Sequence, residues 1–354
     1  MPITVSPLYG PPPVEVAYEL AHLSDALDGQ ISPKELDRNL IIASWNLREF
    51  GNLTKKWKTE KGDSPKRNLG DVHYIAEILS RFDVVAVQEV QSNLEALRLV
   101  MTLLGPDFGF HITDISGGDE GDDERLAFIY DLRRVRPSGL AGELTLTVED
   151  LGVLPRGKAG DKDAEPPDPL VEALDRQLVK PPYVMSFMTA GRPFVLATVH
   201  IIWGDGDNLA PRAEEVEALA KMVKRLAKAP GGDSGVEFRS NVIALGDTNL
   251  TGEDDPIYKA LVENGLQPDT ETLDKPRTVS DAKKAGQAIA YDQIAWIAAP
   301  PGKAAPPGAL EFRRRKGDTF QWNTFVLQDA DGDTTFRISD HFPLWLEFSV
   351  REAA

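Results

Sequence analysis

The stretch "RISDHFPLWLEF" (residues 337–348) places a Ser-Asp-His triplet directly before a strongly apolar run. Leucine and aromatic residues fill most of that run, which is typical of a strand buried on at least one face. Asp340 and His341 lie directly before this strand. A carboxylate and an imidazole lose water at such a position and need partners. The rest of the sequence should therefore supply groups that meet them.

Other apolar runs of the chain also end in polar side chains. "LIIASWN" ends at Asn46, "DVVAVQE" at Glu89, "FVLATVH" at His200, and "VIALGDTN" carries Asp247 and Asn249. If these strand ends meet at one edge of packed sheets, carboxylates, amides and imidazoles gather there. Hard oxygen ligands without cysteine suit Mg²⁺, Mn²⁺ or Ca²⁺ better than zinc.

Each of these residues has a simpler interpretation when it is taken alone. Asn46 and Asp247 could cap the turns that follow their strands, and His200 could be a core histidine with satisfied hydrogen bonds. Glu89 is harder to explain in this way, because a carboxylate after an apolar run is desolvated and needs a cation or donors. The functional interpretation rests on the recurrence of the pattern.

The chain alternates apolar runs with amphipathic segments. Residues 71–82, 94–104 and 210–228 carry apolar side chains at helical spacing, and many short strand candidates lie between them. Many strands with few long helices predict two sheets packed face to face and covered by helices. We expect residues 1–38 to be an N-terminal extension with one short helix, and residues 39–354 to form one folded domain.

Composition limits the class of protein. The 354-residue chain has 39 basic and 56 acidic residues, a net charge of −17, which argues against capture of a polyanion by the whole surface. Basic clusters at 55–67, which contains Trp57, and at 313–316 could still bind phosphate, or could be solvated loops. Cysteine is absent, which excludes disulfides and thiolate chemistry. Neither a membrane span nor a signal peptide is visible, so we expect a cytoplasmic protein.

The motifs together resemble a known family. "IIASWNLREFGN", "DVVAVQEVQ", "DERLAFIYDLRRV", "FVLATVHIIWGDGD", "VIALGDTNLT", "IAYDQIAWI" and "ISDHFPLWLEF" resemble the successive motifs of the endonuclease/exonuclease/phosphatase superfamily, and their order is closest to deoxyribonuclease I. The resemblance covers about residues 39–350 and implies a four-layered α/β sandwich, two packed sheets flanked by helices. It agrees with the fold that the strand pattern predicts.

The resemblance implies a metal site and a phosphate site. Glu89 matches the principal metal carboxylate, with Asn46 and Asp340 beside it and Asp247 near a second ion or the attacking water. The implied cofactor is Mg²⁺, with Mn²⁺ or Ca²⁺ as alternatives. The residues implied to contact the substrate phosphate are Arg48, Lys180 and Asn249.

The resemblance also implies two histidine–carboxylate pairs for proton transfer. His341 would be oriented by Asp292, and His200 by Glu124. We expect His200 to protonate the leaving oxygen and His341 to act on water or phosphate, with Asp247 as a competing base.

The implied activity is metal-dependent hydrolysis of DNA phosphodiester bonds. The sequence departs from deoxyribonuclease I at two places. Lys180 stands where deoxyribonuclease I has an arginine, which keeps the positive charge and should alter only the phosphate geometry. Asp122 and Gln91 replace its groove-binding side chains, which weakens the case for duplex DNA as the substrate. The alternative is a phosphoesterase of the same superfamily that acts on a phospholipid head group, an inositol phosphate or a nucleotide. A module that binds a partner without catalysis is a third interpretation, which the intact motifs disfavour.

Overall fold

The computed structural model describes residues 9–116, 123–147, 177–202, 210–228, 240–282, 289–299, 302–326 and 334–351. Within these residues, one sheet is formed by β1 (Asn39–Phe50), β2 (Val84–Gln91), β3 (Phe108–Ile112), β4 (Glu124–Asp131), β11 (Arg313–Thr319) and β12 (Leu344–Ser349). Its strand order is β11-β12-β1-β2-β4-β3. Only β1 and β2 pair in parallel in this sheet, and the other neighbours are antiparallel.

The second sheet has the same number of described strands. It contains β5 (Arg136–Glu143), β6 (Tyr183–Thr189), β7 (Arg192–His200), β8 (Val242–Asp247), β9 (Leu266–Pro268) and β10 (Asp292–Ile297). Its order is β5-β6-β7-β8-β10-β9, with β7 and β8 as the parallel pair. Each sheet thus holds one parallel pair among antiparallel neighbours.

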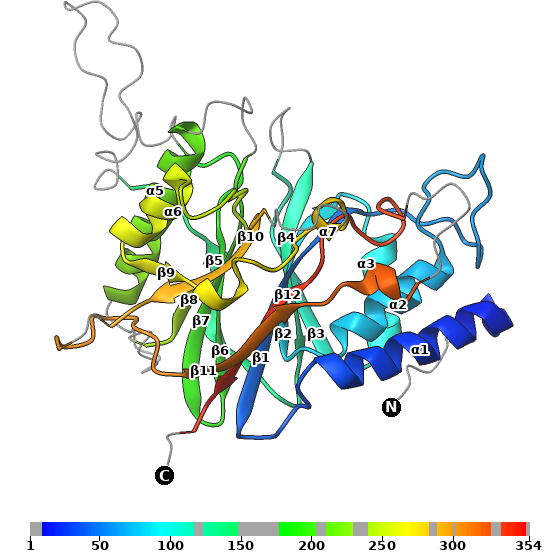
Figure 1. Cartoon of the computed structure of the whole chain (residues 1–354), viewed down its shortest axis with the longest axis horizontal. Coiled ribbons are helices and arrows are strands. Elements are labelled where there is room, and N and C mark those ends of the chain that lie inside the picture. Colours follow the sequence, from blue (N-terminus) through cyan, green and yellow to red (C-terminus); the bar gives the residue numbers. More distant parts are fainter. Residues whose placement is uncertain are drawn as a thin grey trace, which may run out of the picture.

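Helices cover the outer face of each sheet. The first sheet carries α1 (Val14–Gln30), α2 (Leu69–Leu79) and α3 (Glu95–Leu104), and the second carries α5 (Ala210–Lys228) and α6 (Pro256–Glu263). Figure 1 shows these two groups of helices on opposite sides of the sheets. The predicted four-layered α/β sandwich is confirmed.

The alternation along β1 explains why its sequence is apolar throughout. Leu40 and Ile42 enter the core between the two sheets, whereas Ile41 and Ala43 enter the core under the helices. Successive side chains of a strand point to opposite faces. A strand covered on both faces therefore reads as a continuous apolar run.

The helix near the N-terminus is longer than the short helix that the sequence predicts. α1 spans 17 residues, and Val16, Leu23 and Leu27 are buried in the same cluster as α2 and β1. Glu19 of this helix accepts a hydrogen bond from the Tyr74 hydroxyl of α2. The segment before residue 39 is therefore packed on the sandwich, and a domain boundary there stays a prediction.

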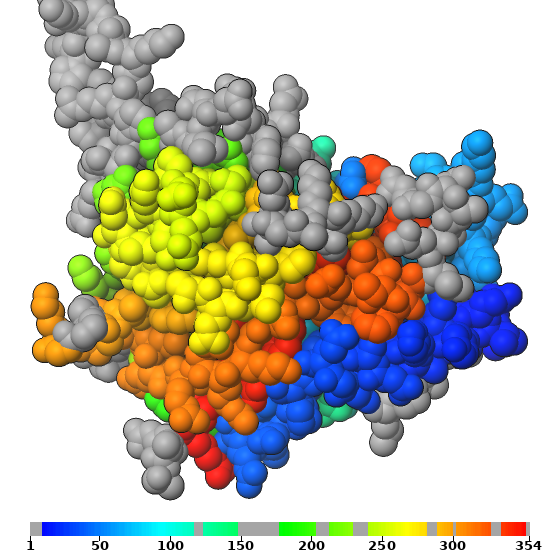
Figure 2. Space-filling view, in the orientation of Figure 1, coloured from blue at the N-terminus to red at the C-terminus, as the bar shows by residue number. Residues whose placement is uncertain are grey.

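Several elements lie outside the predicted strands. β5 contains proline and two glycines, β9 has three residues, and β11 begins with three arginines, so none has a strand-like apolar pattern. β11 is an edge strand paired with β12. Figure 2 shows this part of the chain (orange) on the surface between α6 (yellow) and α1 (blue).

The remaining described helical elements are short. They are α7 (Val279–Ala282) and two single 3-10 turns at Thr270–Thr272 and Trp322–Thr324. None of the helices in the described ranges is both long enough and apolar enough to cross a lipid bilayer.

Candidate active site

The predicted polar strand ends meet at one edge of the sandwich. The parallel pairs β1/β2 and β7/β8 end there, and β4, β10 and β12 begin there. We call this the carboxylate–histidine edge; its residues are Asn46, Glu89, Glu124, His200, Asp247, Asn249, Asp292 and His341. The expectation that these positions come together is confirmed by the geometry described below, whereas their roles stay proposals.

Backbone irregularities aim the side chains at this edge. The register of β1 against β2 shifts between Asn46 and Phe50, and that of β2 against β4 shifts between Val87 and Val90. Glu89 lies in the second shift with a φ of 61°. Such a conformation costs a non-glycine residue about 1–3 kcal/mol, and it is found where structure holds a side chain in a required direction.

The first cluster joins Glu89, Asn46 and Asp247. The Asn46 amide donates from Nδ2 to Glu89 Oε1 at 2.7 Å and to Asp247 Oδ2 at 3.2 Å. The backbone N–H of Glu49 donates to the other oxygen of Glu89 at 2.9 Å. Two carboxylates from different sheets therefore converge on one neutral amide.

His341 and Asp292 form the first predicted pair. Nδ1 of His341 lies 2.7 Å from Asp292 Oδ2, and its Nε2 lies 3.7 Å from Asp247 Oδ2. Burial disfavours the charged ring, but Asp292, Asp247 and Asp340 outweigh it and raise the pKa of His341 to about 10. The ring is therefore held as an imidazolium that faces Asp247.

His200 and Glu124 form the second predicted pair. Nδ1 of His200 lies 2.6 Å from Glu124 Oε1. The pair links β7 of the second sheet, which carries His200, to β4 of the first sheet, which carries Glu124. Burial acts to lower the pKa of His200, but the hydrogen bond and charge of Glu124 outweigh it and raise the pKa. Glu89, Glu124 and His200 each bring a ligand atom within 4.8 Å of the others, so this pair adjoins the first cluster.

Lys180 lies behind the second pair. Its ammonium group is 3.0 Å from Glu124 Oε1 and its side chain is buried. The contact holds the carboxylate that orients His200. A direct contact of Lys180 with a substrate phosphate, which the resemblance implies, stays a prediction.

Asp247 and Asn249 are held by the turn after β8. The Asn249 N–H donates to Asp247 Oδ1 at 3.0 Å, and the Asn249 side chain donates to the backbone oxygen of Ile201 at 2.7 Å. His341 and His200 outweigh the effect of burial and lower the pKa of Asp247. Asp247 is therefore an ionised acceptor between the two histidines.

Gly246 allows β7 and β8 to approach each other beside Asp247. Its φ is 147°, and a Cβ atom there would lie 2.0 Å from the backbone oxygen of Val199. Only glycine fits such a position. The glycine of the "GD" sequence thus sets the distance between the strands that carry His200 and Asp247.

Arg48 and Asp340 pair with each other at the rim. The distance between Arg48 Nη1 and Asp340 Oδ2 is 3.3 Å, and the Arg48 guanidinium lies 3.7 Å from the ring centre of Phe336. Asp340 is 37% exposed in its side chain and belongs to neither group of converging metal-ligand atoms. Its expected place among the metal ligands stays a prediction.

Two buried arginines support this edge, a role that the sequence analysis did not predict. Arg67 donates to the backbone oxygens of Leu47, Arg48 and Glu49, and also to those of Arg337 and Ile338. It therefore ties the end of β1 to the segment before His341.

Arg277 supports the His341–Asp292 pair in the same manner. It donates from Nε to the backbone oxygen of Asp292 at 2.9 Å, and its own backbone oxygen accepts from Phe342. An arginine in a loop sequence is usually interpreted as solvated. The only signal in the sequence that could have identified Arg277 is its position near a site motif.

The basic clusters are largely engaged within the fold. Trp57 packs against His73 with ring centres 5.0 Å apart, and Arg314 pairs with Asp269 and Glu271. Arg315 pairs with Glu347. The clusters therefore have structural partners. Asp122, expected at a groove-binding position, lies outside the described residues.

The side chains at the edge fit a divalent metal ion. They offer carboxylate oxygens and imidazole nitrogens without sulfur, which matches the preference of hard cations for oxygen. Two groups gather their ligand atoms within 4.8 Å: Glu89, Glu124 and His200, and Asp247, Asp292 and His341. The convergence of Glu89 and Asp247 on a neutral amide leaves negative charge that a cation would balance.

Comparison with solved structures agrees with the fold. An endonuclease/exonuclease/phosphatase family protein from Bacteroides thetaiotaomicron is 19% identical, with a TM-score of 0.54, and the alignment covers 89% of this chain and 98% of that one. The D. rerio TDP2 structure complexed with single strand DNA product is 14% identical, with a TM-score of 0.51 and coverages of 88% and 98%.

A third similar structure is that of an enzyme named for a different kind of substrate. The mannosyl-6-phosphatase of Bacteroides thetaiotaomicron VPI-5482 is 18% identical, with a TM-score of 0.51 and coverages of 87% and 99%. No family model and no curated protein sequence matches the chain. The chain has the fold of the endonuclease/exonuclease/phosphatase superfamily, whose solved members include nucleases and phosphatases.

Proposed function

We propose that the chain is a divalent-metal-dependent phosphodiesterase that hydrolyses DNA. One observation carries the proposal: two histidine–carboxylate pairs flank the carboxylates of Glu89 and Asp247 at a single edge. Phosphodiester hydrolysis needs positive charge on the phosphate, a base for water and an acid for the leaving oxygen. This edge offers groups of each kind.

The metal would be held by Glu89, with Asn46, Asp247 and Asp340 as its expected neighbours. When bound, Mg²⁺ supplies Lewis-acid stabilisation and lowers the pKa of coordinated water, and Mn²⁺ or Ca²⁺ are alternatives. Glu89 is prepared for this role by the N–H of Glu49, which fixes one of its oxygens.

His200 is assigned as the acid that protonates the leaving oxygen. Its Nδ1 is engaged by Glu124, which fixes the tautomer and leaves Nε2 to face the substrate. The hydrogen bond and charge of Glu124 raise the pKa of His200, which favours the protonated ring that an acid needs. Lys180 holds Glu124 in place by its own contact with the same oxygen.

His341 is assigned to donate a hydrogen bond to the phosphate, and Asp247 is assigned as the base for the attacking water. The imidazolium of His341, oriented by Asp292, can donate to a phosphate oxygen, while Asp247 is an ionised acceptor beside it. Arg48 and Asn249 are the further proposed phosphate contacts. This division gives the base role to Asp247 because a ring with a pKa of about 10 is already protonated.

A small phosphoester is the second candidate substrate. The net charge of −17 and the engagement of Trp57, Arg314 and Arg315 in the fold favour it over a long polyanion. The similar mannosyl-6-phosphatase acts on such a substrate, whereas the similar TDP2 structure holds single strand DNA. DNA remains the first candidate because both histidine pairs are present.

The proposal is tested with purified protein, supercoiled plasmid and each divalent cation in turn. We expect nicking that requires the cation and is abolished in His341→Ala and Glu89→Gln. A parallel panel of RNA, inositol phosphates, nucleotides and sugar phosphates measures substrate choice. Faster turnover of a small ester would replace DNA as substrate, and no turnover of any phosphoester would refute the proposal.

A further inference from the structure

A pocket lined by arginines lies at the end of the sandwich opposite the carboxylate–histidine edge. We call it the arginine pocket; it has a volume of about 570 Å³ and is lined by Leu36, Asp37, Leu132, Arg133, Arg134, Arg136, Met188, Ala190, Gly191 and Arg351. These residues come from both sheets and from the ends of strands. In a chain with a net charge of −17, four arginines in one pocket stand out against the acidic surface.

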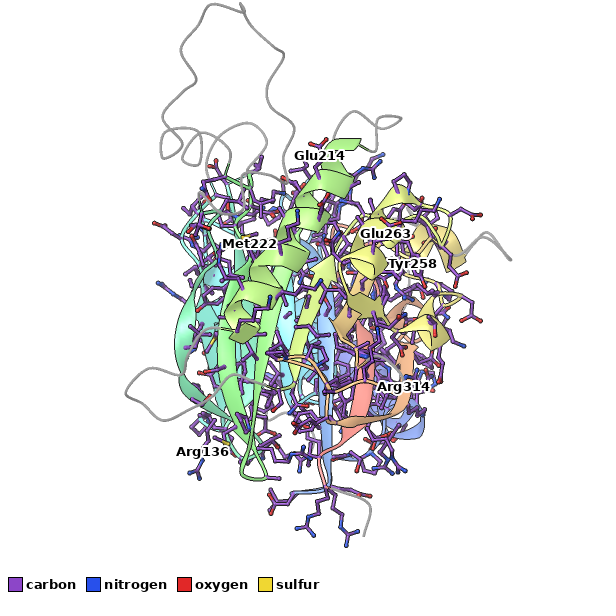
Figure 3. All side chains as sticks on the ribbon, turned by 90° about the vertical axis from the view of Figure 1, so that its left-hand side faces the viewer. Arg136, Glu214, Met222, Tyr258, Glu263 and Arg314 are labelled. Atoms are coloured by element: carbon purple, nitrogen blue, oxygen red, sulfur yellow. The ribbon has the colours of Figure 1, made fainter. Side chains whose placement is uncertain are left out.

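Strand direction places the pocket far from the proposed active site. β4 begins at Glu124 and ends beside Leu132, and β12 begins after His341 and ends before Arg351. At about 3.3 Å per residue, the eight residues of β4 separate the two sites by roughly 25 Å. Figure 3 shows Arg136 at the end of the strands opposite Glu214, with its side chain directed away from the body.

The arginines divide into two kinds. Arg133 pairs with Asp131, and Arg134 pairs with Asp83 and also donates to the backbone oxygen of Asn39. These bonds hold the wall of the pocket rigid.

Arg136 and Arg351 are different, because their side chains are exposed and have no ion-pair or hydrogen-bond partner among the described residues. The pocket contributes one carboxylate, that of Asp37. Two guanidinium groups are therefore available to an anion, and their planar donors suit phosphate oxygens.

The pocket also has an apolar wall. Leu36 is 66% exposed and Leu132 is 40% exposed, and Met188 lies with them in the lining. Exposed leucines beside free arginines suit a ligand with both an apolar and an anionic part. The volume falls in the range of about 300–1,000 Å³ that is usual for small-molecule sites.

We propose that the arginine pocket binds a small organic phosphate of nucleoside diphosphate size. Arg136 and Arg351 bind the phosphates, and Leu36, Leu132 and Met188 contact the apolar part. The site is separate from the proposed active site and does not depend on its function.

The test is calorimetric titration of the full chain with adenosine diphosphate, pyrophosphate and adenosine. EDTA is present throughout, so that metal-dependent hydrolysis at the other edge does not consume the nucleotide. The test variant is Arg136→Gln/Arg351→Gln. The matched control is Arg98→Gln/Lys259→Gln, which removes two exposed positive charges outside the pocket. His341→Ala serves as a second control for binding at the other edge.

We expect adenosine diphosphate to bind the wild-type chain, and the Arg136→Gln/Arg351→Gln variant to bind at least about tenfold more weakly, because two charge-assisted contacts are lost. The control variant and His341→Ala should stay within about twofold of wild type. Pyrophosphate should bind more weakly than the nucleotide, and adenosine should bind more weakly still.

Three results would overturn the proposal. The first is no binding of adenosine diphosphate by the wild-type chain at millimolar concentration. The second is an equal loss of affinity in the test and control variants, which would mean general electrostatic attraction. The third is equal affinity for pyrophosphate and the nucleotide, which would exclude the apolar wall from the site. Circular dichroism checks that each variant is folded.

Discussion

The two ends of the sandwich differ in the partners of their carboxylates. At the carboxylate–histidine edge, Glu89 meets an amide and a backbone N–H, and Asp247 meets amides and a histidine. At the other end, Asp83 pairs with Arg134, and Asp131 pairs with Lys34 and Arg133. At the first end, neither Glu89 nor Asp247 forms an ion pair with a lysine or arginine of the described residues, whereas at the other end Asp83 and Asp131 both do.

This difference indicates which carboxylates serve function and which serve stability. A buried carboxylate that is paired with arginine has little capacity left for a ligand, and removal of one partner of such a pair is destabilising. Two carboxylates that converge on one neutral amide cost free energy, and such a cost persists where a site needs the charge. Substitutions of the carboxylates at the first edge should therefore affect chemistry, and substitutions of the paired carboxylates at the other end should affect stability.

The largest expected effect is the loss of activity in His341→Ala. Removal of a group that acts on the phosphate should lower kcat/KM by about 10²- to 10⁴-fold, with the fold retained. Steady-state rates on the substrate found in the panel measure it. His111→Ala is the control, because His111 of β3 bonds to the hydroxyl of Tyr130 on β4, away from the edge. Equal losses in the two variants would contradict the assignment.

Gly246→Ala should be the most destabilising change at the carboxylate–histidine edge. The added Cβ would meet the Val199 backbone oxygen at 2.0 Å, which no rotamer can relieve. We expect a loss of at least about 3 kcal/mol in the free energy of unfolding, measured by urea denaturation. Gly142→Ala is the control, because a Cβ there meets nothing within 4 Å. A stable Gly246→Ala protein would show that β7 and β8 can separate without harm.

Glu89→Gln should weaken metal binding without destabilising the fold. The variant loses a negative charge that faces Asp247 through Asn46, so its melting temperature should be equal to or higher than that of wild type. Its affinity for Mn²⁺, measured by calorimetry, should fall by at least about tenfold. A destabilised variant with unchanged Mn²⁺ affinity would reverse the comparison of the two ends.

Asp131→Asn is the matching change at the other end and should have a smaller effect, about 1–3 kcal/mol on stability. Burial opposes ionisation, but Arg133 and Lys34 outweigh it and lower the pKa of Asp131 to about 2. Since the folded pKa lies below the unfolded value of about 3.9, this contribution is present above pH 4 or so and is lost as the pH falls towards 2.

Denaturation at several pH values between about 7 and 2.5 tests the sign of this effect. The difference in stability between wild type and Asp131→Asn should shrink as the pH falls through this window. Mn²⁺ affinity at neutral pH should be unchanged. A difference that grows on acidification would mean that Asp131 is not held ionised by its cations.

The sequence predicts what depends on burial and on motif order. The apolar runs at β1, β2, β7, β8 and β12 are strands because both their faces are covered, and the histidine–carboxylate pairs meet at the positions that the resemblance implies. β5 and β11 could not be predicted, because edge strands need no apolar pattern.

Individual side-chain partners were also beyond the sequence. Arg67 and Arg277 satisfy backbone oxygens contributed by distant segments, and only the folded chain brings these oxygens together. Asp340 faces Arg48 at the rim, although its position in the motif implies a metal ligand. Trp57 belongs to a basic cluster that could bind phosphate or be a solvated loop, and its ring packs on His73.

Anomalous scattering from crystals soaked in Mn²⁺ tests the central claim most directly. The account predicts a peak that contacts the Glu89 carboxylate at the carboxylate–histidine edge, and the loss of that peak in Glu89→Gln crystals. A peak elsewhere, or no peak at saturating Mn²⁺ in crystals where the edge is open to solvent, would contradict it.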